Sequence, residues 1–309
     1  MHADAIDRIR DFNRFYTQRL GLLSDRYLGL DRPLGHSRLL WEIGDRAAVR
    51  DLREHLGLDS GYLSRLLRAL EQQGLIRVVP HPDDARGRVA ELTGAGRRER
   101  AALDERSRDG VAALVAGLDP EQRAELVEAQ ERVRRLLRLA SITIGPVPAR
   151  DPAAWRCLRR YATELAGRFP EGYDEATLTT PEELDGTLLL AREQDRPAGC
   201  GAWVRLSPGV AEIRHLWVAG EARGLGLGRL LLRGLEADAA AHGVTTVRLG
   251  THRVLTEALA LYRAAGYHEI DGYGSSPYNQ MCFEKRVQAV AGSAAGAGDS
   301  SDTRRLSAR

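Results

Sequence analysis

Lysine is almost absent from this sequence, because Lys285 is the only lysine among 45 basic residues and arginine supplies the remaining positive charge. The chain therefore has almost no ε-amine of its own to modify. Its formal net charge is only +2, which excludes an overall basic field. Any contact with nucleic acid must then come from a local cluster of arginines.

Cysteine is also scarce. The three cysteines, Cys157, Cys200 and Cys282, are far apart and form no C-x-x-C pair, which argues against a disulfide framework and against a cysteine metal site. We expect reduced thiols in the core and no bound metal. Charged residues interrupt every apolar stretch, so the sequence has neither a signal peptide nor an apolar run of membrane-spanning length. We therefore expect a cytoplasmic protein with no membrane contact.

A chain of 309 residues is long enough for two domains, each with a core of its own. Residues 141–148 follow a long helical pattern and combine β-branched residues with glycine and proline, which indicates that the helix ends there and a strand of a new domain begins. We predict one domain at 1–140 and a second at 141–287. Residues 288–309 are rich in Ala, Gly and Ser and lack an apolar period, so we expect a disordered tail.

The most informative stretch is Arg223-Gly-Leu-Gly-Leu-Gly228, which lies between a strand-like run, 212–218, and a helix-like run, 229–242. Glycines remove the Cβ atoms that would keep an anion from the main chain, and the following helix adds the positive end of its dipole. The loop is therefore predicted to hold a pyrophosphate. A dinucleotide fingerprint would need glycine in place of Arg229 or Leu231, and a P-loop would need Gly-Lys-Ser/Thr, so both alternatives fail.

The pattern R-x-x-G-x-G, with Arg223, Gly226 and Gly228 at the defined places, resembles the GNAT superfamily of N-acetyltransferases. The resemblance covers about residues 142–287, including the preceding strand Ala-Glu-Ile-Arg-His-Leu-Trp-Val and the later segments Leu-Tyr and Ala-Ala-Gly-Tyr. It implies an α+β fold with a mixed, mostly antiparallel central sheet, and acetyl-CoA as co-substrate. One departure is Leu255, where many members carry Asn, so a contact at a helix start is expected to differ. The residues expected to bind acetyl-CoA are Leu216, Trp217, Val218, Arg223, Gly224, Leu225, Gly226, Leu227, Gly228 and Arg229.

Acetyl transfer to an amine requires a neutral amine, a hydrogen-bond donor that stabilises the negative charge developing on the carbonyl oxygen, and a proton for the departing thiolate. The resemblance implies that Tyr262 is the general acid and that Glu212 is the base, acting through water. His215 is the rival base, because its pKa lies nearer neutrality, but its odd spacing from Glu212 would turn it to the opposite face of a strand. Main-chain groups of residues 216–218 are expected to pair with the pantetheine arm and to supply the oxyanion N–H.

Helical spacing of apolar residues dominates the beginning of the chain. Residues 58–71 open with Asp59 and Ser60 as N-cap candidates, and apolar leucines recur on one face. A preceding short helix ends near Gly57, so the pair has the parts of a helix-turn-helix, whose second helix enters a major groove. Arginine on the polar face can bond guanine there. The residues of this helix expected to face DNA are Ser60, Tyr62, Ser64, Arg65 and Arg68.

Two strand-like runs, 75–80 and 89–93, enclose a polar tip and predict a β-hairpin. Together with the preceding helix, this hairpin resembles the wing of the MarR family of winged-helix transcription regulators, over about residues 1–140. The resemblance implies that Arg86 reaches a minor groove while Asp84 braces it, and we add Arg88 as a phosphate contact. It also implies a homodimer, formed by the flanking helical segments 4–25 and 94–140.

Two functions of different class fit these residues. In the first, the second domain acetylates a small amine or a protein while the first domain regulates transcription. In the second, the acetyltransferase fold only senses acetyl-CoA or another ligand and biases DNA binding. The glycine loop together with a candidate acid and base favours catalysis. The acceptor is not identified, although its site is expected to include Tyr173, Tyr273, Tyr278 and Asn279.

Overall fold

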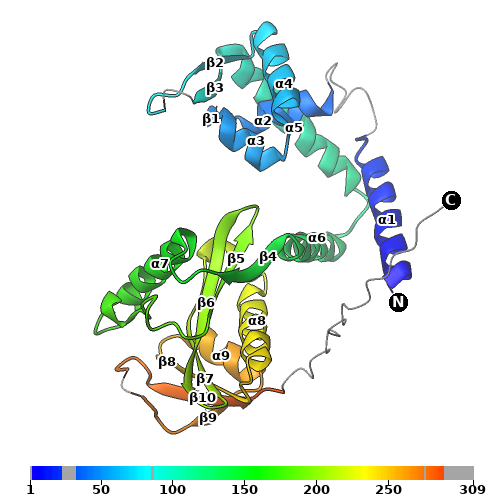
Figure 1. Ribbon diagram of the computed structural model, residues 1–309. Helices are drawn as coiled ribbons and strands as arrows, with labels where there is room; N and C mark the ends of the chain where they lie inside the picture. Colours follow the sequence, from blue (N-terminus) through cyan, green and yellow to red (C-terminus); the bar gives the residue numbers. More distant parts are fainter. Residues whose placement is uncertain (1, 23–32, 85–86, 275, 289–309) are drawn as a thin grey trace, which may run out of the picture. The chain divides into compact units, whose positions relative to one another are not determined.

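The computed structural model describes residues 2–22, 33–84, 87–274 and 276–288. Contacts within the chain separate two compact units, Met1–Leu126 and Val127–Arg309, and each is described by itself (Figure 1).

The first unit is mainly helical, as predicted. Its three strands form a small antiparallel sheet in the order β1-β3-β2, and β2 and β3 are the expected hairpin. Only residues 2–19 of the predicted first helix are helical, and its last expected residues lie outside the described ones. The elements are α1 (His2–Arg19), α2 (Leu34–Glu42), β1 (Arg46–Ala48), α3 (Val49–Leu56), α4 (Ser60–Gln72), β2 (Ile76–Pro80), β3 (Arg88–Leu92) and α5 (Gly94–Leu114).

The sequence signals around α4 explain its position. Asp59 is the N-cap, and its carboxylate accepts a hydrogen bond of 2.8 Å from the main-chain N–H of Tyr62, which satisfies one of the free amides of the first turn. One face of the helix is buried against α2, α3, α5 and the small sheet, and the opposite face is left to solvent. The buried leucines are Leu63, Leu66, Leu67 and Leu70.

The second unit is built on a seven-stranded sheet in the order β4-β5-β6-β7-β8-β10-β9. Only the β7–β8 pair is parallel, so the sheet is mixed and mostly antiparallel, as expected. The long helix α6 (Pro120–Ala140) leads into it. The remaining elements are β4 (Ile142–Val147), α7 (Pro152–Arg168), η2 (Glu175–Thr177), β5 (Thr187–Glu193), β6 (Arg196–Ser207), β7 (Val210–Val218), η3 (Gly220–Ala222), α8 (Leu227–Ala241), β8 (Thr246–Thr251), α9 (Thr256–Ala264), β9 (His268–Ile270) and β10 (Met281–Arg286).

The predicted domain limits remain predictions. The chain does change from helix to strand where α6 ends at Ala140 and β4 begins at Ile142, whereas the two compact units divide inside α6. The tail predicted at 288–309 lies outside the described residues from 289 onward.

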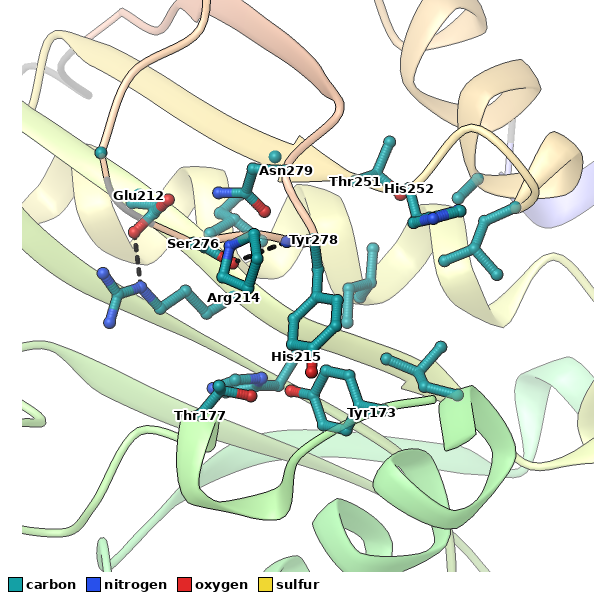
Figure 2. Close-up of a pocket in the computed structure, with 18 of the residues that line it drawn as sticks. Tyr173, Thr177, Glu212, Arg214, His215, Thr251, His252, Ser276, Tyr278 and Asn279 are labelled. Carbon is teal, nitrogen blue, oxygen red and sulfur yellow. Dashed lines mark hydrogen bonds and ion pairs between the residues drawn. The ribbon is translucent and has the colours of Figure 1, made fainter. Parts of the chain in front are cut away.

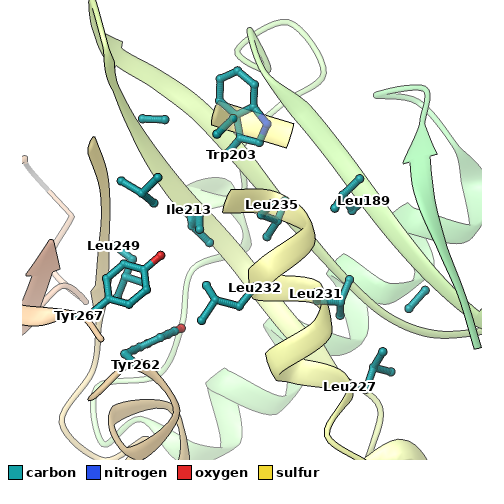
Figure 3. Close-up of a cluster of buried hydrophobic side chains, with 14 of the residues drawn as sticks. Leu189, Trp203, Ile213, Leu227, Leu231, Leu232, Leu235, Leu249, Tyr262 and Tyr267 are labelled. Carbon is teal, nitrogen blue, oxygen red and sulfur yellow. The ribbon is translucent and has the colours of Figure 1, made fainter. Parts of the chain in front are cut away.

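The sheet of the second unit is covered on both faces, by α7 on one side and by α8 and α9 on the other (Figure 1). The cluster under α8 contains Trp203 and Phe283, which are among the largest fully buried side chains (Figure 3). The cluster under α7 includes Cys157 and Cys200. These two cysteines and Cys282 are free and buried, as expected for core thiols.

A polar pair lies at the edge of the core beneath α8. Glu236 is buried on that helix and forms an ion pair of 2.8 Å with the Nζ atom of Lys285. The lysine ammonium also lies 5.4 Å from the centre of the Tyr267 ring. The single lysine of the chain therefore neutralises a buried carboxylate.

An irregularity interrupts β7 where it pairs with β6. Ala202 pairs with Arg214 and Cys200 pairs with Trp217, so β7 holds one more residue than β6 between these pairs. His215 adopts a φ of 54° at this point, as expected for a β-bulge. The extra residue reverses the alternation of side chains along the rest of the strand.

In the described part of the chain, no helix is long and apolar enough to cross a membrane. The same residues contain no group of three or more His, Cys, Asp or Glu side chains arranged to hold a metal ion.

Candidate functional site

The glycine loop joins β7 to α8 as the sequence predicts. Gly224 and Gly226 have φ values of 74° and 93°, a region that side chains with a Cβ rarely occupy. Gly226 is the N-cap of α8 and makes no side-chain cap, so the first amides of the helix are open to an anion. Leu225 and Leu227 bury their side chains in the core, so these two residues offer only main-chain groups.

Arg223 turns away from the amides of this loop. Its Nε donates to the Val218 carbonyl at 3.1 Å, and its Nη2 lies 2.5 Å from the Glu164 carboxylate. Glu164 also accepts a bond of 2.9 Å from the Trp217 indole. Arg223 therefore braces the end of β7 against α7, whereas Arg229 is exposed on the first turn of α8.

The end of β7 has a free edge. The parallel ladder with β8 runs only from Val210 to Ile213, whereas β7 continues to Val218. Within the described residues, the edge of 216–218 that faces away from β6 has no strand partner. Apart from the Val218 carbonyl, which already accepts from Arg223, the main-chain groups on this edge can therefore pair with an amide-rich ligand.

A cavity of about 430 Å³ opens beside this free edge (Figure 2). It contains the candidate acid and both candidate bases, and it also contains all four predicted acceptor residues. Its wall comes from α7, β7, the end of β8, α9 and the chain between β9 and β10. The predicted residues that line it are Glu212, His215, Leu216, Tyr262, Tyr173, Tyr273, Tyr278 and Asn279.

Glu212 is buried, with 5% of its surface exposed. Its carboxylate lies 2.5 Å from the Nε atom of Arg214, two residues along the same strand. Burial, followed by the charge of the nearby Glu212 carboxylate, raises the pKa of the Tyr273 phenol. Glu212, Arg214 and Tyr273 thus form one polar group at the cavity wall.

His215 corrects the expectation drawn from strand alternation. Because of the bulge, His215 lines the same cavity as Glu212 instead of the opposite face of the sheet. Its Nε2 accepts a hydrogen bond of 3.0 Å from the main-chain N–H of Thr179, so the proton of the neutral ring belongs on Nδ1. Burial and the charge of Arg214 lower the pKa of His215 to about 4.

Tyr262 belongs both to the core and to the cavity. Its ring lies 6.0 Å from those of Tyr267 and Phe283, and 7% of the residue is exposed. Burial raises the pKa of the Tyr262 phenol. The helix α9 that carries it starts after Leu255, which provides no side-chain cap, in agreement with the expected difference at that helix start.

The predicted DNA-facing residues of α4 lie on its polar face. Ser60, Tyr62, Arg65 and Arg68 are exposed and Ser64 is half-buried. The Arg65 guanidinium lies 5.8 Å from the centre of the Tyr62 ring.

At the predicted wing, Arg88 is exposed at the start of β3. Arg86 lies outside the described residues, and so does its predicted contact with Asp84. Of the wing arginines, only Arg88 can thus be placed on the surface.

Some residues of the cavity were missed by sequence reasoning. Tyr161, Leu165 and Phe169 recur every four residues along one side of α7 and all line the cavity, so helical spacing carries a signal that could have found them. His252 carries no such pattern, since it stacks on Phe169 and lies 3.1 Å from Glu171, both distant in sequence. Arg214 stands two residues after Glu212 on β7, so strand alternation places both side chains on one face and could have found it.

The comparisons with known proteins agree with this geometry. The sequence model of the acetyltransferase (GNAT) family matches residues 154–267. An IAA acetyltransferase of Azospirillum brasilense is 34% identical over 142 residues, which are 45% of this chain and 92% of that protein. The chain belongs to the GNAT family. The MarR family model matches residues 28–87, so a MarR domain precedes the GNAT domain.

Two further matches concern the GNAT domain. A mycothiol acetyltransferase of Clavibacter michiganensis is 29% identical over 150 residues, which are 48% of this chain and 49% of that protein. The crystal structure of a GNAT-family acetyltransferase of Staphylococcus aureus matches with a TM-score of 0.43 and 16% identity, over 48% of this chain and 99% of that one.

Proposed function

We propose that this chain is a DNA-binding transcription regulator joined to an acetyl-CoA-dependent N-acetyltransferase that acts on an amine. One observation carries the proposal: the free edge of β7 ends at the glycine loop and borders a cavity that contains Glu212 and Tyr262. Acetyl-CoA fits this arrangement, because the uncapped amides of α8 suit its pyrophosphate and the free edge at 216–218 suits its amide-rich arm. It supplies an acetyl group activated as a thioester.

The reaction forms a bond between the amine nitrogen and the carbonyl carbon and breaks the bond between that carbon and sulfur. Glu212 removes the amine proton through water, and a main-chain N–H of residues 216–218 stabilises the charge on the carbonyl oxygen. Tyr262 donates a proton to the departing thiolate, so an amide and a free thiol result. Glu212 is favoured over His215, because the Nε2 lone pair of His215 is engaged by Thr179.

For the first domain, we propose binding to double-stranded DNA through the exposed face of α4 and through Arg88 and Arg86. Arg65 and Arg68 are the candidates for base contacts, because they project from the helix that the MarR fold inserts into a major groove. The protein must meet its operator, so we assign it to the cytoplasm.

We also propose a homodimer. Large apolar side chains are exposed on α1, α5 and α6, and a face of this kind is normally covered in a folded assembly. The residues are Ile6, Ile9, Phe12, Phe15, Val111, Val127, Val133, Leu136 and Leu137.

Release of free thiol from acetyl-CoA, measured with and without added amines, tests the catalytic proposal.

Gly226→Val should abolish acetyl-CoA binding in calorimetry, because a branched side chain meets both the ligand path and an unfavourable φ of 93°. Gly220→Ala is the matched control, since Gly220 has ample space for a Cβ and no positive φ. Normal acetyl-CoA affinity in Gly226→Val would show that the glycine loop does not hold the pyrophosphate.

One observation favours the second candidate function, a sensor. Arg138, near the end of α6, donates to both carboxylate oxygens of Glu193 at 2.8 and 2.7 Å and to the Glu221 carbonyl at 3.1 Å. Leu139 lies 3.9 Å from the position of a Cβ on Gly226. The helix α6 thus ends against the glycine loop, so ligand binding there can affect this helix.

Operator affinity, measured with and without acetyl-CoA, tests the sensor. A change in wild type that is lost in Arg138→Ala, together with no amine-dependent thiol release, would favour sensing over catalysis. Equal operator affinity with and without acetyl-CoA would remove it.

A further inference from the structure

We infer that the acceptor is a small monoamine with an aromatic body, and not a polypeptide, a polyamine or an amino acid. The inference rests on the proposed acetyltransferase function and concerns the cavity beside β7. Three features carry it. A hydrogen bond bridges two segments at the cavity, aromatic side chains form much of its wall, and the described lining residues include no unpaired carboxylate or guanidinium.

The bridge joins two segments that lie far apart in the sequence. The main-chain N–H of Asp174, between α7 and β5, donates to the Tyr278 hydroxyl at 2.9 Å. The rings of Tyr173 and Tyr278 lie 4.8 Å apart, and those of Phe169 and Tyr278 lie 5.5 Å apart. The chain after α7 and the chain before β10 are therefore tied together at the wall of the cavity, where the Tyr173 and Tyr278 rings lie close to each other (Figure 2).

The bridge rests on a firm support. The Phe169 ring stacks on His252 at 4.3 Å, and His252 is buried at the end of β8. Its Nδ1 accepts from the Val254 N–H and its Nε2 lies 3.1 Å from Glu171. A polypeptide acceptor continues beyond its reacting amine and needs an open groove with free main-chain groups. The tied segments close that route, whereas a small molecule needs only the cavity.

Aromatic rings form much of the wall. The aromatic side chains that line the cavity include Tyr161, Phe169, Tyr173, Tyr278, His215 and His252. Rings prefer edge-to-face or offset contacts with other rings, and their faces attract an ammonium group. A flat aromatic body with one amine satisfies both preferences.

Glu212 and Arg214 are the only carboxylate and guanidinium among the described lining residues, and their charges cancel. The lining residue His252 faces the Glu171 carboxylate at 3.1 Å. Glu212 pairs with Arg214, and His215 is neutral near pH 7 because burial lowers its pKa to about 4. A second ammonium or a carboxylate on the acceptor would enter the cavity without a free counter-charge, which is costly in a buried site. This feature disfavours polyamines and amino acids.

The test compares acceptors with the full chain, measuring thiol release and the mass of the product. The panel is 2-phenylethylamine, hexan-1-amine, phenylalanine, spermidine and a tetrapeptide with a free terminal amine. We expect kcat/KM for 2-phenylethylamine to exceed that for hexan-1-amine by about 2- to 10-fold, from aromatic contacts. It should exceed that for phenylalanine by roughly 100-fold, because the carboxylate is left unpaired. The tetrapeptide should not react.

Variants at Tyr173 separate ring contact from hydroxyl chemistry. Tyr173→Leu should raise KM for 2-phenylethylamine by about 2- to 10-fold and leave KM for hexan-1-amine unchanged. Tyr173→Phe keeps the ring, so the ratio of KM for 2-phenylethylamine to KM for hexan-1-amine should stay at the wild-type value, whatever the hydroxyl contributes to each KM. Acetyl-CoA affinity, measured by calorimetry, should be unchanged in both variants and shows that they are folded.

Tyr278→Phe removes only the bridging hydroxyl. It should raise kcat/KM for the tetrapeptide relative to kcat/KM for 2-phenylethylamine, because the two segments are no longer tied. An unchanged ratio would show that the bridge does not exclude polypeptides.

The outcomes separate this inference from the function on which it rests. Tetrapeptide, spermidine or phenylalanine reacting with wild type as well as 2-phenylethylamine would overturn the acceptor class while leaving the acetyltransferase intact. No thiol release with any amine, despite acetyl-CoA binding, would overturn the catalytic proposal itself.

Discussion

Two regions of the molecule differ in the exposure of their large apolar side chains. The helices α1, α5 and α6 expose them, whereas the seven-stranded sheet and its covering helices bury them. Phe15 on α1 is 61% exposed and Leu137 on α6 is 65% exposed. In the described residues of 142–288, Leu206 and Leu230 are the only exposed large apolar side chains, at 40% and 36%. The sheet thus covers its apolar side chains within one chain, whereas the helices leave theirs open, which is why we propose a partner surface for them.

The largest expected effect comes from charging the uncovered helices. Phe15→Glu should convert the proposed dimer into a monomer and strongly weaken operator binding, because a monomer presents only one recognition helix to the DNA. Amine-dependent thiol release should continue. Light scattering after size exclusion gives the mass, and Leu206→Glu is the control for a charge added elsewhere. A Phe15→Glu variant that remains a dimer would show that the exposed apolar side chain of α1 is not part of the dimer interface.

The next effect concerns the covered region. Tyr262→Phe keeps the ring in the core and removes only the hydroxyl, so turnover should fall by roughly 10- to 1,000-fold at unchanged acetyl-CoA affinity. Tyr267→Phe is the matched control, because Tyr267 is equally buried but does not line the cavity. Equal loss in both variants would mean that Tyr262 serves packing, and full activity in Tyr262→Phe would remove its hydroxyl from the mechanism.

A smaller effect should appear as a pH dependence of stability. The pKa of His215 is lowered from 6.5 to about 4 by burial, so the unfolded chain binds this proton at a higher pH than the folded chain. Its contribution to stability is therefore complete above pH 6.5 and is lost as the pH falls from about 6.5 to 4, by at most about 3 kcal/mol.

His215→Asn should flatten this part of the profile, since asparagine does not titrate and tolerates the positive φ. Urea unfolding of wild type and variant between pH 4 and pH 8 measures the difference. Parallel profiles would show that His215 is not responsible.

The smallest effect is expected at single DNA contacts. Arg65→Ala should weaken operator binding by about 1–3 kcal/mol without changing the dimer, because a guanidinium to guanine contact is lost. Arg196→Ala removes an exposed arginine from the β5–β6 turn and should leave operator affinity unchanged. Binding assays at fixed salt make the comparison, and equal affinities would exclude Arg65 from the interface.

Local patterns predicted local structure well. The N-cap at Asp59, the hairpin after it, and the glycine loop before α8 all depend on residues a few positions apart, so the sequence contains the whole cause. The bulge at His215 does not follow from β7 alone, because it is defined by pairing with β6. The strict alternation of a regular strand therefore gave the wrong face for that residue.

The candidate site was predicted in part for the same reason. The glycine loop and Tyr262 lie in short motifs, whereas the Asp174–Tyr278 bridge joins residues 104 positions apart. The pairing of Glu212 with Arg214 joins positions i and i+2 of one strand, which share a face, so alternation contains a signal for it. The bridge arises from packing between distant segments and has no periodic signal.

The pair formed by half-buried Lys285 and buried Glu236 leaves the protein with almost no free lysine on its surface. The only side-chain amine in the sequence is held 2.8 Å from a carboxylate, so an acetyl donor in solution finds almost no lysine on the protein to acylate. Acylating Lys285 would also leave Glu236 as a buried negative charge without its counter-ion. Under the proposed function, acetylation of the protein's own lysines is thereby limited to one half-buried side chain that is already paired with a carboxylate.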